Sequence, residues 1–244
     1  MHSRPTARHR DGIVLLAAAL VSLLACGEPK PEAPGLSPIE QAMQEDSLID
    51  LGQEPFEHVG FDYENLNRVA WQKPDLVLDR LGPLKDRVVV EIGSGTGFFT
   101  RRLANRGARV FAVDIDPGML LRLDSLNRSQ LSAEAYQRVE PIRGQASDPR
   151  LPQGVAHAAL VVNTFMYIDE RQTYLERLGQ ALLPSSPVVV VDFKRESTPI
   201  GPPVTARLHS EDVVDSMRGA GLVDIEVDEQ ALDFQYIVTG RVPD

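Results

Sequence analysis

The sequence predicts an α/β fold in which helices cover both faces of a mostly parallel sheet. A β-branched apolar run at residues 88–92 leads into a glycine-rich segment, and a helical pattern follows at 98–106. Beyond this unit, short apolar segments typical of buried strands alternate with amphipathic segments typical of helices. The chain closes with a helix and a pair of strands. We therefore expect seven strands with an antiparallel end to the sheet.

The later elements follow in regular alternation. The expected strands fall at 109–113, 139–142, 158–163, 187–193, 223–227 and 234–238, and the expected helices after the first at 117–127, 171–183 and 210–220. Gly107 and Gly221 follow two of the helices, where glycine commonly ends a helix in the left-handed conformation. Asp116 before Pro117 predicts one helix N-cap, and Ser210 predicts another.

Composition narrows the possible functions. The chain has 244 residues, a formal net charge of -10 and a pI near 5.0, which argues against a large nucleic-acid-binding surface. A single cysteine excludes an intramolecular disulfide and a cysteine metal cluster. No His, Cys or carboxylate spacing supports a zinc or iron site, so we expect no metal.

The N-terminus reads as a targeting segment. A basic lead precedes an apolar run at 13–25, which is too short to span a bilayer comfortably. The run ends in Leu-Leu-Ala-Cys26, which resembles a bacterial lipobox and implies cleavage before Cys26 and lipid attachment to its sulfur. An uncleaved anchor or a misassigned start codon is the alternative. A proline-rich stretch follows, and its prolines favour an extended tether.

We therefore divide the chain into four parts: a signal peptide at 1–25, a tether at 26–38, a helical N-terminal extension or cap at 39–82, and the main domain at 83–244. Within the extension, two helical segments are expected between residues 56 and 81, the second starting at Pro74.

The glycine-rich segment carries the strongest functional signal. Gly93, Gly95 and Gly97 alternate with small residues, and Glu91 lies two positions before the first of them. A dinucleotide-binding fingerprint would place its third glycine further along. The pattern E-x-G-x-G-x-G resembles motif I of the class I methyltransferases that depend on S-adenosylmethionine (SAM). The resemblance covers roughly residues 56–241 and implies a Rossmann-like seven-stranded sheet with SAM as the cofactor.

Two further segments resemble a group of uncharacterised bacterial methyltransferase-domain proteins. They are the W-Q-K-P element at 71–74 and the D-F-K element at 192–194. Trp71, the only tryptophan, is read either as a packing anchor, slightly favoured, or as a site residue. Many members of that group carry His-His where this chain has Met166-Tyr167, which weakens any transfer of a histidine-based mechanism.

Asp114 lies about twenty residues beyond the glycine loop, where an acid can accept hydrogen bonds from both ribose hydroxyls. Gln145 or Asp148 could bond the adenine amino group, and the sequence leaves that choice open. The resemblance implies the following cofactor contacts: Glu91, Gly93, Ser94, Gly95, Gly97, Asp114, Ile115, Gln145, Ala146 and Asn163.

No single residue is identified as catalytic by the sequence. A sulfonium methyl group is already electrophilic, so a general base is needed only when the acceptor arrives protonated. Candidates on the expected acceptor side are Tyr167, Asp192, Lys194, His209 and Tyr236, and each has a purely structural alternative.

The expected function is methyl transfer from SAM to a small-molecule, membrane-associated or lipid-like acceptor. A non-catalytic exported module that keeps the fold is the main alternative, and the glycine spacing disfavours a nicotinamide-dependent oxidoreductase. A lipidated Cys26 would place the domain on the periplasmic face of a membrane, away from the cytoplasm where SAM is made. An unprocessed N-terminus would leave the protein cytoplasmic. The sequence predicts no oligomeric state.

Overall fold

The computed structural model describes residues 68–244. The predicted signal peptide, Cys26, the tether and residues 39–67 of the predicted extension lie outside this range, so the division of the chain at residues 25, 38 and 82 stays a prediction. None of the helices in 68–244 is both long enough and apolar enough to cross a membrane.

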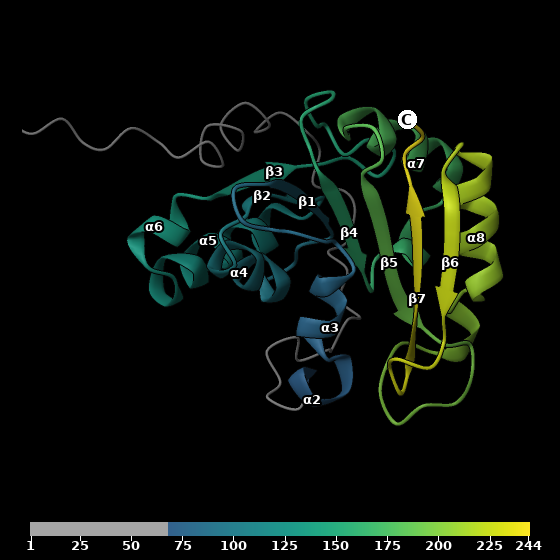
Figure 1. The fold of residues 1–244 in the computed structure, drawn as a ribbon. Helices are drawn as coiled ribbons and strands as arrows, with labels where there is room; N and C mark the ends of the chain where they lie inside the picture. The colour runs from purple at the N-terminus through teal and green to yellow at the C-terminus, as the bar shows by residue number, and fades with distance from the viewer. Residues whose placement is uncertain (1–67) are drawn as a thin grey trace, which may run out of the picture. The chain divides into compact units, whose positions relative to one another are not determined.

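A seven-stranded sheet forms the centre of the described structure, in the order β3-β2-β1-β4-β5-β7-β6 (Figure 1). Neighbouring strands from β3 to β5 are parallel, whereas β7 runs antiparallel to β5 and β6. The strands are β1 (Val88–Ile92), β2 (Arg109–Asp114), β3 (Val139–Arg143), β4 (Ala158–Val162), β5 (Pro187–Phe193), β6 (Val223–Asp228) and β7 (Gln235–Arg241). This order confirms the predicted fold class.

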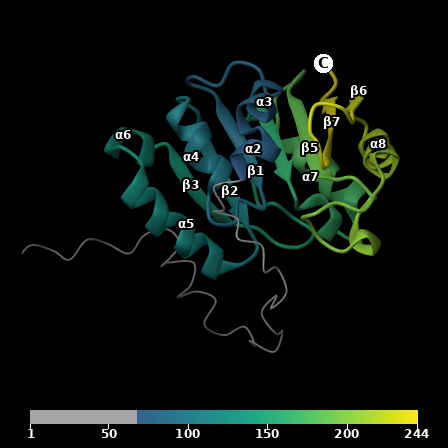
Figure 2. The ribbon, with the colours of Figure 1, turned by 90° about the horizontal axis from the view of Figure 1, so that it is seen from below.

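Helices lie on both faces of the sheet (Figure 2). They are α2 (Arg68–Gln72), α3 (Pro74–Asp79), α4 (Phe98–Asn105), α5 (Pro117–Gln130), α6 (Ala133–Tyr136), α7 (Arg171–Ala181) and α8 (Ser210–Gly219), with 3-10 turns η1 (Phe165–Tyr167) and η2 (Val204–Ala206). As predicted, Pro74 begins the second helical segment. The short α6, η1 and η2 escaped the sequence analysis because they are too short to show a helical period.

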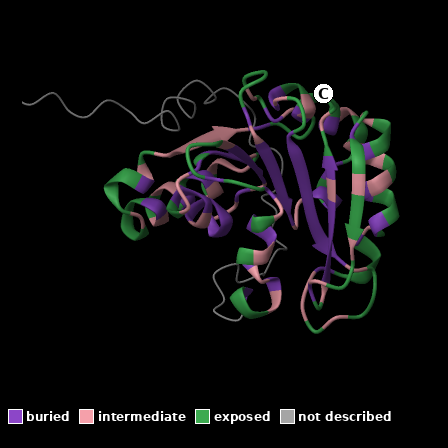
Figure 3. Cartoon of the chain, viewed as in Figure 1, coloured by how far each residue is buried: buried purple, intermediate pink, exposed green. Residues whose placement is uncertain are grey.

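The two faces of the sheet support two apolar cores because side chains alternate along each strand. Val89 and Val191 face the core that contains residues of α3 and α4. Val90 and Val190 face the opposite core, which contains residues of α7 and α8. All residues of β5 are buried, while β6 at the sheet edge is mostly exposed (Figure 3).

Helix capping follows the sequence at one predicted N-cap and departs from it at the other. Asp116 caps α5 as predicted, its side chain accepting a hydrogen bond from the Gly118 N–H at 2.7 Å. The prediction of Ser210 as the N-cap of α8 is wrong: Ser210 is the first helical residue and His209 is the N-cap. The Asp212 carboxylate accepts from the His209 N–H at 2.9 Å, and the Ser210 hydroxyl bonds Glu229 at 2.6 Å instead of capping the helix.

The order of connections places the functional edge of the sheet. From β1 the chain continues to β2 and β3 on one side, and it then returns to build β4 and β5 on the other. The carboxyl ends of β1 and β4 therefore border a switch point, which is where ligands bind in open α/β sheets.

Candidate functional site

A pocket of about 250 Å³ lies at the carboxyl ends of β1, β2 and β4. This volume is slightly below the roughly 300 Å³ at which sites for drug-sized ligands begin. All the predicted cofactor residues except Gly97 line the pocket: Glu91, Gly93, Ser94, Gly95, Asp114, Ile115, Gln145, Ala146 and Asn163. Gly97 instead forms the N-cap of α4, with φ 88°. The structure thus brings together residues from four separate segments, while their role as cofactor contacts stays a prediction.

The glycine loop between β1 and α4 can take its path only with residues that lack a Cβ at the close approaches. Gly93 and Gly95 have φ values of 70° and 52°, in the left-handed region. A Cβ on Gly93 would lie 2.0 Å from the Thr164 hydroxyl oxygen, whereas a Cβ on Gly95 would meet no atom within 4 Å. Gly93 is therefore needed for packing against the end of β4, and Gly95 leaves open space on the pocket side.

Asp114 at the end of β2 already holds the loop. Its Oδ2 accepts from the Gly95 N–H at 2.8 Å and its Oδ1 from the Asp116 N–H at 3.0 Å. Burial raises the pKa of Asp114, while these backbone N–H groups act in the opposite direction. Because each carboxylate oxygen has two lone pairs, both can still accept a hydrogen bond from a ligand hydroxyl.

Glu91 lies beneath the loop in a desolvated position. It is only 4% exposed, and the Thr100 hydroxyl donates to its Oε2 at 2.5 Å. Burial raises the pKa of Glu91 to about 8, against the lowering effect of Thr100 and of the guanidinium groups of Arg68 and Arg101. A pKa near 8 favours the protonated carboxyl group at neutral pH.

Arg68 of α2 also lines the pocket, and the sequence analysis missed it. Its guanidinium carbon lies 4.0 Å from the centroid of the Phe98 ring, and its Nε donates to the Gln72 side-chain oxygen at 2.6 Å. No local motif marks this arginine, because only the packing of α2 brings it to the glycine loop.

The two candidates for the adenine contact, Gln145 and Asp148, differ in position. Gln145 lines the pocket and Asp148 is not among its lining residues. The Asp148 carboxylate instead accepts from the Arg150 N–H at 2.7 Å and lies 3.8 Å from Arg177. Ile115 lines the pocket and is 45% exposed. Its apolar side chain is accessible to a flat base.

Of the acceptor-side candidates, only Tyr167 lines the pocket. Asp192 and Tyr236 are buried cross-strand neighbours on β5 and β7, and their side-chain oxygens have no hydrogen-bond partner among residues 68–244. Burial raises the pKa of Asp192 to about 8 and raises that of Tyr236 further above its usual range. His209 is exposed at the start of α8, and Lys194 donates to the Asp233 carbonyl at 3.2 Å.

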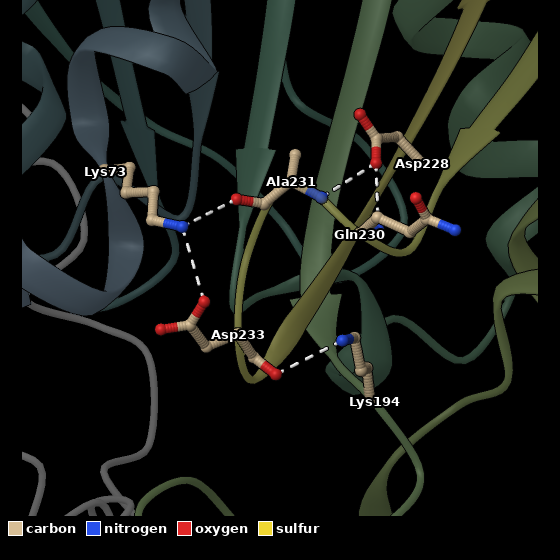
Figure 4. A network of polar contacts seen from close by, with 6 residues as sticks. All are labelled: Lys73, Lys194, Asp228, Gln230, Ala231 and Asp233. Carbon is tan, nitrogen blue, oxygen red and sulfur yellow. Dashed lines mark hydrogen bonds and ion pairs between the residues drawn. The ribbon is translucent and has the colours of Figure 1, made fainter.

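The W-Q-K-P element packs against the carboxyl end of β5 and the loop between β6 and β7. The Trp71 ring packs 5.6 Å from Phe193 and 6.4 Å from Phe234, measured between centroids, and Trp71 does not line the pocket. Lys73 donates to the Ala231 carbonyl at 2.9 Å and lies 3.3 Å from the Asp233 carboxylate (Figure 4). The packing interpretation of Trp71 accounts for these contacts.

The remaining described surface offers a larger but less specific hollow. It measures about 600 Å³ and is bordered by residues of β6, β7 and the start of α8, several of them carboxylates. Within residues 68–244, no group of three His, Cys, Asp or Glu side chains is arranged to hold a metal ion.

Part of the described chain resembles known proteins. Residues 89–185 fit the model of a family described as "Methyltransferase domain". Residues 89–185 are therefore similar to a methyltransferase domain. An uncharacterised methyltransferase of Mycobacterium tuberculosis is 32% identical over 122 residues, which cover 49% of this chain and 57% of that relative. The chain thus spans little more than half the length of that curated relative.

Two solved structures share the fold. A SAM-dependent methyltransferase from Aquifex aeolicus superposes with a TM-score of 0.66 at 22% identity, over 73% of this chain and 94% of its own. A geranyl diphosphate C-methyltransferase from Streptomyces coelicolor, solved with S-adenosylhomocysteine, gives 0.60 at 15% identity, over 73% of this chain and 81% of its own. At these identities the likeness shows the fold alone.

We predict that Gly93→Ala destabilises the protein far more than Gly154→Ala. Both glycines have positive φ, but an added Cβ is blocked by Thr164 at residue 93 and meets open space at residue 154. Left-handed strain alone costs roughly 1–2 kcal/mol, and overpacking adds about 1–3 kcal/mol. Urea unfolding of both variants measures the difference, and equal losses would contradict the close approach.

A second prediction concerns pH. Glu91 has an ordinary pKa of 4.5 and a folded-state pKa of about 8, so the folded state holds a proton that the unfolded state releases between these values. Stability should therefore fall as pH rises from about 5 to 8, by up to about 1.4 kcal/mol per pH unit from this group.

Glu91→Gln should remove this pH dependence. The stability of the variant relative to the wild type should therefore rise as pH increases from about 5 to 8. Thermal unfolding at several pH values measures it, with the exposed Glu226→Gln as the control. A constant difference between wild type and Glu91→Gln would show that Glu91 is ionised in the folded protein.

Proposed function

We propose that this protein binds SAM in the pocket at the β1–β4 switch point and transfers its methyl group to a small-molecule acceptor. The observation that carries the proposal is the convergence of the glycine loop, Asp114 and Asn163 on one pocket. The family match and the shared fold support it.

The residues present fit this cofactor. Ser94 lines the pocket, is 5% exposed, and its hydroxyl has no hydrogen-bond partner among residues 68–244, so it can bond a polar ligand atom. Gly95 leaves room for the ligand, and Asp114 offers acceptor sites to a diol. The carboxyl group of Glu91 would lose its proton to meet a positively charged ligand.

When bound, SAM supplies a methyl group on a positively charged sulfur, and the acceptor's electron pair forms the new bond as the carbon–sulfur bond breaks. The protein's contribution is to hold the two reactants close and in line. Tyr167, 46% exposed on the pocket rim, is the residue best placed to contact the acceptor. Burial and the nearby Asp192 raise the pKa of Tyr167, which keeps its hydroxyl protonated as a hydrogen-bond donor.

We infer an acceptor with an apolar part. Met119 and Ile168 line the same pocket as Tyr167, and such side chains favour apolar ligand surface. The Streptomyces coelicolor neighbour is a geranyl diphosphate C-methyltransferase, and the geranyl group is apolar. An apolar part in the acceptor agrees with that example, but we do not propose the same substrate.

Isothermal titration calorimetry of the full chain against SAM, S-adenosylhomocysteine and NAD tests the cofactor. Micromolar binding of the first two without NAD binding is expected. Binding of NAD alone would replace the methyltransferase proposal with an oxidoreductase one, and binding of none of them would favour a non-catalytic module.

A matched pair of glycine variants locates the binding site. Gly95→Asn should weaken SAM binding at least tenfold because its side chain extends into the open space of the pocket, and asparagine tolerates positive φ. Gly82→Asn makes the same change at another positive-φ glycine with open space, outside the pocket lining, and should bind SAM as the wild type does. Equal affinities for the two variants, measured by the same calorimetry, would place the SAM site elsewhere.

The location of the protein is a separate proposal that depends on the lipobox-like sequence at residues 23–26. We propose that Cys26 is lipidated and anchors the domain to a bacterial membrane. Metabolic labelling with a tagged fatty acid should mark the wild type and not Cys26→Ser, and the wild type should partition into detergent. An unlabelled wild type in the cytoplasmic fraction would favour the unprocessed alternative.

A further inference from the structure

Three amide side chains, the buried Gln72 and Gln235 and the partly buried Asn163, connect α2 to the pocket. The Gln72 side-chain nitrogen donates to the Gln235 side-chain oxygen at 2.9 Å, and the Gln235 nitrogen donates to the Asn163 side-chain oxygen at 2.5 Å. At the outer end, Arg68 Nε donates to the Gln72 oxygen at 2.6 Å. Gln72 and Gln235 are both fully buried, so these bonds replace contacts that water would otherwise make. We name Arg68, Gln72, Gln235 and Asn163 the amide relay.

The relay has a direction. Arg68 can only donate, which makes the Gln72 oxygen the acceptor and turns the Gln72 nitrogen toward Gln235. The same choice then repeats at Gln235. The Asn163 oxygen is thereby engaged, and its Nδ2 group, which has no hydrogen-bond partner among residues 68–244, is left as a donor.

Asn163 lies where such a donor matters. It follows the last residue of β4, lines the pocket, and has φ 56°, a conformation that asparagine adopts more readily than most residues. Its backbone N–H donates to the Val191 carbonyl at 2.9 Å, which fixes the main chain at this point. The backbone thus sets the position of the side chain, and the relay sets which end of the amide faces the ligand.

We propose that Gln72 and Gln235 are positioning residues that hold the Asn163 amide with its NH₂ group toward an oxygen of the bound cofactor. The ligand class is an oxygen acceptor, such as the carboxylate of SAM or S-adenosylhomocysteine. This inference rests on the proposed function for the identity of the ligand, but the orientation of the relay can be tested without any ligand.

Gln235→Glu should reverse the orientation of the Asn163 amide in a way that depends on pH. A residue with a purely structural role would show no such dependence. While the introduced carboxyl group is protonated, it can accept from Gln72 and donate to Asn163, as the native glutamine does. Once ionised, the same group can only accept, so the Asn163 amide must rotate and present its oxygen to the pocket. Burial favours the protonated form at low pH, which makes the change dependent on pH.

The experiment is calorimetric titration of S-adenosylhomocysteine into the full-length wild type, Gln235→Glu and Gln230→Glu at pH 5.5, 7 and 8.5. Gln230 is exposed in the β6–β7 loop, so Gln230→Glu matches the chemical change outside the relay. The dissociation constant of Gln235→Glu relative to wild type should be near one at pH 5.5 and at least tenfold higher at pH 8.5. That of Gln230→Glu should stay near one throughout. A Gln235→Glu ratio that does not change with pH overturns the proposal.

Hydrogen exchange in the ligand-free wild type tests the orientation of the three amides, and it does not require the variant to fold. In the ¹⁵N-labelled wild type, hydrogen exchange of the side-chain NH₂ groups should be slow for Gln72 and Gln235 and fast for Asn163. Slow exchange at Asn163, or fast exchange at Gln235, overturns the assigned orientation. If the wild type binds neither SAM nor S-adenosylhomocysteine, the proposed function fails, and the exchange pattern still decides the orientation of the amides.

Discussion

The pocket depends on the close approach of the glycine loop to the end of β4. Gly93 packs against Thr164 so tightly that any Cβ would overlap the threonine side chain. The Gly93 and Ser94 N–H groups both donate to the Val113 carbonyl, and Gly95 donates to Asp114, so the same loop is fastened to β2. The loop is thereby held on both sides of β1. Ligand-facing groups can then lie on a backbone that does not have to reorganise when a ligand binds.

Electrostatics follow from that geometry. The acids closest to the glycine loop lie at the ends of buried strands, where desolvation disfavours their charge. Asp114 offsets this cost with two backbone N–H groups, whereas Glu91 has one hydroxyl donor and nearby guanidinium groups and keeps a pKa of about 8. Asp192 has no hydrogen-bond partner among residues 68–244 and shares the same raised pKa without lining the pocket. A strongly shifted pKa therefore does not by itself distinguish a ligand-facing acid from one buried for other reasons.

Features that depend on residues close together in the sequence could be predicted, and features that depend on residues far apart could not. The strands could be predicted because their apolar patterns are local in sequence. The pocket residues at the ends of β1, β2 and β4 were implied by the resemblance to motif I of the methyltransferases. Arg68 and the Gln72–Gln235 contact could not be predicted, because the two glutamines are 163 positions apart and no local pattern pairs them. Which acceptor-side candidate lines the pocket could not be predicted either. Asp192 and Tyr236 lie within expected strands and Tyr167 follows one, yet the turn η1, which was not expected, places Tyr167 at the pocket.

The family match covers only the central part of the described structure. The family match ends at residue 185 and begins at residue 89, so it contains the glycine loop, Asp114 and Asn163 but none of α2, β6 or β7. The residues that orient Asn163 come from those outer segments: Gln72 from α2 and Gln235 from the first position of β7. Lys73, the N-cap of α3, bonds the β6–β7 loop, and Trp71 of α2 packs against Phe193 of β5 and Phe234 of that loop. Under the proposed function, the matched core would hold the cofactor, and the segments on either side of it would determine which end of the Asn163 amide faces the pocket.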